Sequence, residues 1–429
     1  MNNNESFSSK KYYNLGLYHY ETGDIMKAIQ FLTLSSNQNN ADAQNILGLI
    51  YLFDQHIPHD ISRAIYYFTL SANQNNSNSQ FYLGYLYFDD KFIPKDINKS
   101  LYYLFQSANQ NNYKACFLLG FIYSSDQYFM KDNSKAIFYF TLAANQNEPN
   151  SQYRLALFYL EGIHVKQDVK KAIRYFTLSA NQKNEQSCLA LGTIYLENTF
   201  VFQDINKSIY YLTIAADNYN VDSQYILGDI YYSGFLIRRD INKAIHYWKE
   251  ASSLGDSKSK NNLGLIYKNG FGVKKNIYNT IECLNEAIKK TKDKYSIYNL
   301  ARIFYFGIDV KRNIQESIVL LNQIDDEGFI PSQLLSFLIN SKENNSINSI
   351  SVAYNDFPVI VLSGKDPPSE KILYDFLKKY DLFHSFVENP ILNFFKSLLS
   401  AFNHESFKER KKKDNRKDIN EFFYQGFYS

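Results

Sequence analysis

The residue types in this 429-residue chain that could perform chemistry do not fall into a catalytic or metal-binding pattern. His56 and His59 are two potential metal ligands in one short segment. No cysteine, histidine or carboxylate follows them at the spacing of a zinc site. The other histidines are scattered and never form the H-E-x-x-H pattern of a zinc protease. We therefore interpret His56-x-x-His59 as a solvated loop and predict that the protein binds no metal.

Three short segments resemble parts of phosphate or catalytic sites, but each is incomplete. Residues 270–272 (Gly-Phe-Gly) have no third glycine and follow a predicted helix, not a strand. Residues 363–366 (Ser-Gly-Lys-Asp) lack the upstream glycine of a phosphate-binding loop and end in aspartate. Residues 325–327 are an acidic turn, and no Ser/His/Asp or Cys/His set is apparent. We predict no cofactor and no enzymatic activity.

The three cysteines do not form a disulfide framework. Cys116 and Cys188 occupy the same repeat position, two units apart. Because neighbouring helices pack about 8–10 Å from one another, this places the two residues tens of Å apart, too far for a disulfide. With Cys283 they are interpreted as reduced, buried residues. The N-terminal residues lack the apolar core of a signal peptide, and no apolar stretch is long enough to span a membrane. We expect a cytoplasmic protein, with a nuclear one as the alternative.

A Leu-Gly pair followed three residues later by tyrosine recurs every 36 residues and organises most of the sequence. Its members are Leu47-Gly48, Leu83-Gly84, Leu119-Gly120, Leu191-Gly192, Leu227-Gly228 and Leu263-Gly264, with alanine replacing glycine at Ala156 and Ala301. A second series has the same period: Asp60, Asp96, Asp132, Asp168, Asp204 and Asp240, continued by Asn276 and Asn313. Self-similarity at this period indicates a solenoid, in which each unit buries its apolar face against its neighbours.

Each unit is predicted to contain two helices. Apolar residues around each Leu-Gly pair recur at helical spacing and predict a first helix, helix A. A glycine inside a helix costs about 1 kcal/mol relative to alanine, so its recurrence predicts close approach of a partner helix. The Asp/Asn series predicts the N-cap of that partner, helix B. Polar runs such as residues 73–76 are interpreted as turns back to the next helix A.

The end of helix A is predicted from residues that stand six positions before the Asp/Asn series. All belong to residue types that tolerate a positive φ, so we predict a left-handed residue at each of them. They are Asp54, Asp90, Asp126, Gly162, Asn198, Gly234, Gly270 and Gly307.

Residues 220–255 show the repeat pattern most completely. They carry Leu227-Gly228, Tyr231, Gly234, Ile237, Asp240, Lys243-Ala244-Ile245, Tyr247-Trp248 and Ala251. In this pattern the chain resembles the Sel-one-like repeat (SLR) family, relatives of the tetratricopeptide repeat, over residues 8–325. The resemblance implies an all-α fold: a right-handed α-solenoid of about nine two-helix repeats of period 36, with a mostly helical C-terminal extension. It also implies an adaptor or scaffold, in some members within ubiquitin-ligase or signalling assemblies.

The tetratricopeptide register predicts which helix-A residues line the concave face, where a protein or peptide partner would bind. In the opposite interpretation, these side chains pack between successive A helices. The predicted residues are Asn45, Leu49, Phe81, Tyr85, Phe88, Phe117, Phe121, Tyr153, Leu157, Asp229, Lys268 and Arg302.

We predict four segments along the chain. Residues 1–7 are a disordered N-terminus, residues 8–339 the solenoid, residues 340–356 a linker, and residues 357–429 a helical extension with a basic tail. Within the extension, the apolar run Phe357–Leu362 has the character of a strand. Before the linker, residues 328–340 are expected to form one A-like helix that closes the stack.

The net charge of +3 (46 cations minus 43 acids) conceals a basic cluster at residues 408–417. Seven cations and two acids give the cluster +5, so the rest of the chain carries −2. This cluster could be a nuclear-import signal or a nucleic-acid contact, but Glu409 and Asp414 interrupt it, and we favour a solvated tail. The leading prediction is a scaffold that binds a protein or peptide partner; the alternative is a nucleic-acid-associated protein that uses this tail.

Overall fold

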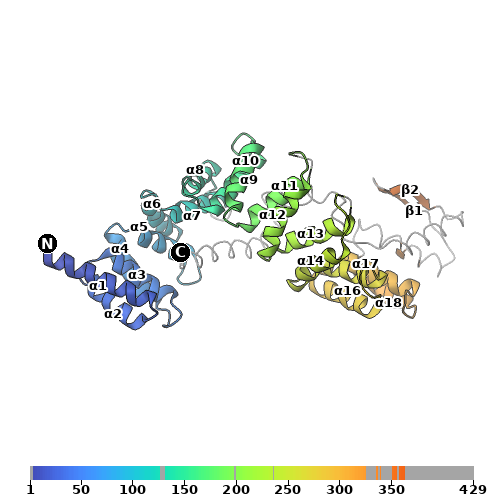
Figure 1. Cartoon of the computed structure of the whole chain (residues 1–429), viewed down its shortest axis with the longest axis horizontal. Helices are drawn as coiled ribbons and strands as arrows, with labels where there is room; N and C mark the ends of the chain where they lie inside the picture. Colours follow the sequence, from blue (N-terminus) through green and yellow to red (C-terminus); the bar gives the residue numbers. More distant parts are fainter. Residues whose placement is uncertain are drawn as a thin grey trace. The chain divides into compact units, whose positions relative to one another are not determined.

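The structure is a computed structural model that describes residues 3–125, 131–197, 200–234, 236–324, 335–336, 339, 350–354 and 357–362. Helices alternate along the chain as the repeat predicts (Figure 1). The A helices are α1 (Asn3–Glu21), α3 (Ala41–Phe53), α5 (Ser77–Phe88), α7 (Tyr113–Ser124), α9 (Pro149–Glu161), α11 (Glu185–Leu196), α13 (Val221–Ser233), α15 (Ser257–Asn269) and α17 (Lys294–Phe306). The B helices are α2 (Ile25–Ser36), α4 (Ile61–Asn73), α6 (Ile97–Ala108), α8 (Asn133–Ala144), α10 (Val169–Ala180), α12 (Ile205–Asp217), α14 (Ile241–Ser253), α16 (Ile277–Thr291) and α18 (Ile314–Leu321).

The chain divides into two compact units, residues 1–187 and residues 188–429. In the first unit each A helix packs on the B helix that follows it, and each B helix packs on the next A helix. In the second unit the same order holds from α12 to α18. The predicted all-α solenoid of two-helix repeats is thus confirmed.

The predicted N-caps of helix B are confirmed in all eight repeats that carry them. Each Asp side chain accepts a hydrogen bond from the backbone N–H three residues later, at 2.9 to 3.1 Å. Asn276 and Asn313 cap α16 and α18 in the same way. The backbone N–H of each cap also donates to a helix-A carbonyl, as from Asp60 to Tyr51 at 2.9 Å. The same residue therefore caps the start of helix B with its side chain and bonds to the end of helix A with its backbone N–H.

The predicted left-handed end of helix A is confirmed only where glycine is present. Gly162, Gly234, Gly270 and Gly307 have φ of 64° to 73°. At Asp54 the prediction is wrong, because this residue is extended, with φ of −67°. Asp90 is also not left-handed. A Cβ atom makes the left-handed region costly, and the Asp54 carboxylate instead accepts from the backbone N–H of His56 at 2.8 Å. Asp126 and Asn198 lie outside the described residues.

The polar runs between helix B and the next helix A form turns, as predicted. Asn39, Asn75, Asn111 and Asn147 are left-handed, with φ of 59° to 65°. Glutamine side chains in and after these turns also connect consecutive repeats. Their side-chain amides form hydrogen bonds in the pairs Gln74–Gln44, Gln110–Gln80 and Gln182–Gln152, at 2.6 to 3.0 Å.

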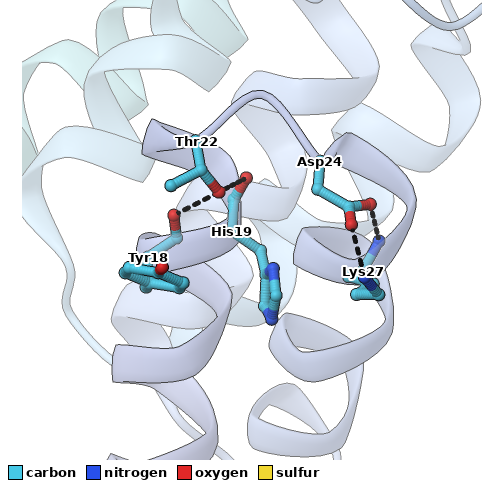
Figure 2. A network of polar contacts seen from close by, with 5 residues as sticks. All are labelled: Tyr18, His19, Thr22, Asp24 and Lys27. Atoms are coloured by element: carbon cyan, nitrogen blue, oxygen red, sulfur yellow. Dashed lines mark hydrogen bonds and ion pairs between the residues drawn. The ribbon is translucent and has the colours of Figure 1, made fainter.

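The first repeat joins its helices by a shorter turn (Figure 2). The Thr22 hydroxyl donates to the carbonyl of Tyr18 at 2.9 Å and closes the end of α1. Asp24 caps α2 by accepting from the backbone N–H of Lys27, and its carboxylate pairs with the Lys27 ammonium at 2.8 Å. The N-terminal prediction is wrong for residues 3–7, because α1 begins at Asn3. Adding residues to an existing helix costs far less than nucleating one.

The described residues after α18 differ in part from a helical extension. Residues 335, 336 and 339 are helical, and Leu335 and Ile339 are buried against Leu320, Leu321 and Ile324. This agrees with the predicted closing helix. Strands β1 (Ile350–Tyr354) and β2 (Phe357–Leu362) then pair antiparallel, with Ile350 opposite Leu362. The strand expected at 357–362 is confirmed, whereas β1 occupies part of the predicted linker. The basic cluster 408–417 lies outside the described residues.

Candidate partner-binding surface

The recurrent glycine of helix A sets how closely the two helices of a repeat approach. A Cβ atom at Gly48, Gly84 or Gly120 would lie 2.6 to 2.7 Å from a side chain of the following helix B. The facing side chains are Phe68, Leu104 and Phe140, which are fully buried. The close approach predicted from the glycine is therefore present in these three repeats.

Most of the predicted groove residues of the first unit are buried in the structure. Leu49 and Tyr153 are half-buried. The other members of this unit are buried: Asn45, Phe81, Tyr85, Phe88, Phe117, Phe121 and Leu157.

The aromatic residues among them contact other rings within a repeat or in the next one. Phe117 lies 6.0 Å from Phe140, centroid to centroid, and Tyr153 lies 5.9 Å from Phe176. Phe88 meets the edge of Phe121 at 6.3 Å, which connects consecutive A helices. These contacts agree with the packing interpretation of the aromatic stripe.

The predicted residues of the second unit are charged side chains of the A helices. Asp229, Lys268 and Arg302 are all buried. Asp229 accepts hydrogen bonds from Trp248 Nε1 at 3.2 Å and from Asn262 Nδ2 at 3.3 Å. Burial and the neighbouring Asp229 carboxylate raise the pKa of Tyr225 well above its ordinary value. In the second unit, carboxylate, amide and cationic side chains therefore stand among aromatic residues such as Tyr225 and Tyr305.

A second surface was not predicted from the sequence. Tyr66, Tyr102, Phe138 and Tyr210 occupy the same position on α4, α6, α8 and α12, and all four side chains are exposed. Each stands edge-on against the next residue, a tyrosine, with ring centroids 5.1 to 5.2 Å apart. The detectable signal was an aromatic residue two positions after the small residue of helix B, at the 36-residue period.

The tyrosine beneath each exposed ring belongs to a stack that recurs in six repeats. In each pair a helix-A ring and a helix-B ring are nearly parallel, with centroids 5.8 to 6.1 Å apart. A cation from helix B lies over the helix-A ring of every pair, at 4.0 to 5.3 Å from its centroid. The pairs are Tyr51–Tyr67, Tyr87–Tyr103, Tyr123–Tyr139, Tyr159–Tyr175, Tyr195–Tyr211 and Tyr231–Tyr247.

The groups that could perform chemistry remain apart in the described part of the chain. No three His, Cys, Asp or Glu side chains there gather as a metal site would require. The His56 ring contacts Asp54 at 3.1 Å, and the two belong to the loop after α3. Burial raises the pKa of the Cys116 thiol to about 11, which keeps it protonated and unreactive at neutral pH. Within the described ranges, no helix combines the length and apolar character needed to cross a bilayer.

Known protein families and solved structures contain the same helical repeat. The model of the Sel1 repeat matches nine consecutive segments: residues 12–40, 41–76, 77–112, 114–148, 149–184, 186–220, 221–256, 257–291 and 294–323. A search of curated proteins gives no match. Among solved structures, a Sel1 repeat protein from Oxalobacter formigenes is 28% identical with a TM-score of 0.55, over 66% of this chain and 84% of that one.

A second solved structure is similar in fold. A protective antigen of uropathogenic Escherichia coli strains with an SLR fold is 20% identical, with a TM-score of 0.53, over 88% of this chain and 85% of its own. The nine matched segments coincide with the helix pairs of the structure and cover more than half of the sequence. The chain therefore belongs to the Sel1 repeat family.

Proposed function

We propose that this chain is a non-catalytic scaffold that binds a protein or peptide partner along the helix-A face of its repeats. Repeats of this family generally mediate protein–protein interaction, and nine of them are present. The observation that carries the proposal is the change in chemistry along that face. The predicted positions are mostly aromatic in the first unit and include the charged Asp229, Lys268 and Arg302 in the second, and these buried side chains shape a face that suits partner segments of differing character.

Burial divides the face into two kinds of residue. Phe81 and Phe117 are almost fully buried, so they shape and stiffen the surface and contribute little direct contact. Leu49 and Tyr153 are half-buried and present apolar atoms that a partner could cover. We propose these two as direct contacts in the first unit. The buried Lys268 and Arg302 are proposed to set the electrostatic preference of the second.

The test compares partner capture by the full-length chain and by two double variants. Leu49→Ser with Tyr153→Ser removes two half-buried side chains from the helix-A face, and its helicity is checked by circular dichroism because Tyr153 also contacts the Phe176 ring. Met26→Ser with Tyr278→Ser is the matched control, because both side chains are exposed on B helices. Partners identified by cross-linking mass spectrometry should be lost from the first variant and kept by the second. Equal recovery from both variants would remove the helix-A face as the binding surface.

The proposal also covers the cellular location of the protein and the kind of assembly that it joins. We place the scaffold in the cytoplasm, within a signalling or ubiquitin-ligase assembly, by analogy with the family alone. The competing function is nucleic-acid binding by the basic cluster 408–417. The two respond differently to salt: apolar contacts weaken little, whereas about five phosphate contacts should lose orders of magnitude in affinity between low and moderate salt. Tight, salt-sensitive binding of RNA or DNA would favour the competing function.

A further inference from the structure

Three consecutive loops of the second unit carry a pair of cations directly before helix B. All six side chains are exposed. The equivalent two positions of the earlier repeats never hold two cations, as at Pro58-His59 and Pro94-Lys95. The pairs are therefore a property of the last three repeats and not of the repeat fold. We name these side chains the basic loop row: Arg238 and Arg239, Lys274 and Lys275, and Lys311 and Arg312.

The three loops contact one another, so the basic loop row is continuous. The Arg239 guanidinium lies 5.6 Å from the ring centroid of Phe271, which belongs to the next loop. The Lys275 ammonium pairs with the Asp309 carboxylate of the third loop at 2.6 Å. The helices on either side of these loops also pack on one another in sequence order. The cations thus follow one edge of the repeats from α13 to α18.

The second cation of each pair is engaged within the protein, as the Lys275 ion pair shows. Arg239 lies over the Tyr232 ring at 4.5 Å from its centroid. The Nε of Arg312 donates to the backbone carbonyl of Tyr305 at 2.8 Å. The first cation of each pair, by contrast, forms no hydrogen bond or ion pair within the described ranges, so its charge is available to a ligand. These cations are Arg238, Lys274 and Lys311.

The same loops carry few carboxylates. Residues 234–240, 270–276 and 307–313 hold six cations and two acids, a net charge of +4. Part of this charge comes from Asn276 and Asn313, which replace the N-cap aspartate of the other repeats. Since asparagine caps a helix about as well as aspartate, the replacement removes negative charge without weakening α16 or α18. In the first unit, four cations and seven acids give −3 over the four equivalent loops, 54–60, 90–96, 126–132 and 162–168.

The charges next to the loops do not reverse this balance. The third residue after each N-cap is Lys243 on α14, Asn279 on α16 and Glu316 on α18, so the first and the last cancel. The Asp240 carboxylate accepts from the backbone N–H of Lys243 at 3.0 Å. An anionic ligand therefore meets a surplus of cations along this edge.

Two exposed phenyl rings accompany these cations. Phe202 occupies the position of Arg238 one repeat earlier, and its side chain is 92% exposed. Phe271 is 41% exposed and lies beside Arg239. Such exposure is unusual for large apolar side chains, whereas Ile237 of the same loops packs against the core. The edge thus combines available cations with flat apolar rings.

This combination fits a single-stranded nucleic acid better than other anionic ligands. A phosphodiester strand brings one negative charge per nucleotide and unstacked bases that stack on aromatic rings. An acidic peptide would pair with the cations but would leave the rings uncovered. A duplex keeps its bases stacked within itself. Two isolated rings also lack the broad apolar face that inserts into an anionic membrane.

We infer that the basic loop row binds a single-stranded nucleic acid. Phosphate groups pair with Arg238, Lys274 and Lys311, and bases stack on Phe202 and Phe271. Because each of the last three repeats presents one of these cations, the strand runs along the edge from repeat to repeat. This site is separate from the helix-A face and from the basic cluster 408–417, and it rests on neither.

The test is a fluorescence anisotropy titration of the full-length chain with a fluorescent oligouridine. Wild type should bind saturably and lose affinity steeply as salt is raised. The variant Arg238→Gln, Lys274→Gln, Lys311→Gln should bind at least about tenfold more weakly. Its slope of log affinity against log salt should be shallower by about 2, because each phosphate contact on a single strand contributes about 0.7. Phe202→Ala should bind at least about fivefold more weakly, because a base loses its stacking partner.

Two variants with the same change in charge serve as controls. One removes three exposed cations of α14 and α16 outside the loops, and the other removes three from the basic cluster. Both should bind the oligouridine as wild type does, and circular dichroism should show unchanged helicity in every variant. The first control is Lys249→Gln, Lys289→Gln, Lys290→Gln, and the second is Lys411→Gln, Lys412→Gln, Lys413→Gln.

Several outcomes would overturn the inference. Absence of saturable binding to wild type would do so, as would equal weakening by the row variant and either control. A duplex bound as tightly as the oligouridine would exclude a single-strand site. Row-dependent binding of polyglutamate that equals that of the oligouridine and is unaffected by Phe202→Ala would assign the row to an acidic protein partner. Row-dependent binding to anionic vesicles, without oligouridine binding, would assign it to a membrane surface.

Discussion

Gly228 of α13 lies so close to Trp248 of α14 that a Cβ atom at position 228 would come within 2.4 Å of the indole ring. The indole is also held in place, because its Nε1 donates to Asp229 at 3.2 Å within the buried core. The ring can therefore not move aside without breaking a buried hydrogen bond. This explains why a residue that weakens isolated helices recurs in the middle of helix A.

Substituting Gly228→Ala should lower the free energy of unfolding by about 1–3 kcal/mol, because the added methyl group overpacks the contact with Trp248. The matched control is Gly264→Ala, where the nearest atom to the new Cβ would be the Thr280 carbonyl oxygen at 3.3 Å. There the helix-propensity gain of about 1 kcal/mol should offset the tighter contact. Chemical denaturation of both variants measures the difference. Equal effects at the two positions would refute this role of the glycine.

Leu119 of α7 is a core residue of its repeat. It is fully buried, so Leu119→Ala should cost about 2–5 kcal/mol through lost burial and the cavity left behind. Leu254→Ala is the control, because Leu254 is exposed after α14 and should change stability by well under 1 kcal/mol. Thermal and urea unfolding would both detect the contrast, and a neutral Leu119→Ala would contradict the packing of helix A on helix B.

Asp132 should stabilise the first turn of α8 in a pH-dependent way. The backbone N–H of Lys135 donates to its carboxylate, and this bond and the Lys135 charge hold the pKa of Asp132 below its ordinary value. A lowered folded-state pKa means that the stabilisation is present above the unfolded pKa of about 4 and is lost as pH falls through the folded value. Asp132→Ala should therefore lower the Tm at pH 7 but have little effect near pH 2.

The conservative variant Asp132→Asn separates capping from charge. Asparagine caps helices about as well as aspartate, so this variant should keep most of the Tm and lose the acid-dependent part. A Tm deficit of Asp132→Ala that stays constant from pH 7 to pH 2 would show that the carboxylate charge has no role.

Glu161, at the end of α9, should make the protein less stable as pH rises. Burial raises its pKa to about 7, and no described residue donates a hydrogen bond to either carboxylate oxygen. The folded state therefore binds this proton more tightly than the unfolded state, whose carboxyl has a pKa of about 4.3, and stability falls between those two values. Glu161→Gln should raise the Tm at pH 8 and leave it nearly unchanged at pH 4.

The exposed Glu282 of α16 supplies the control for this experiment. Glu282→Gln should shift the Tm little at either pH. A Glu161→Gln variant whose Tm follows that of wild type at every pH would show that the Glu161 carboxylate is solvated.

Much of the fold could be predicted because its signals are local and repeated. The 36-residue period, the N-cap series from Asp60 to Asn313 and the glycine of helix A each indicate the same helix pair. Local signals predict the wrong backbone conformation where two residue types occupy the same repeat position but adopt different conformations there. Gly162 ends its helix in the left-handed region, whereas Asp54 remains extended and uses its carboxylate to accept from the following loop.

The sequence alone determined the repeat, its two helices and the N-caps of helix B, because these depend on residues within one turn or one period of each other. Only the tertiary structure decided which aromatic residues are accessible. Phe81 and Tyr66 are both aromatic residues in helices at repeating positions, yet one is fully buried and the other is exposed. Periodicity establishes which residues share a face of a helix, but exposure depends on what the neighbouring helices place against that face, and this is known only once the repeats are stacked.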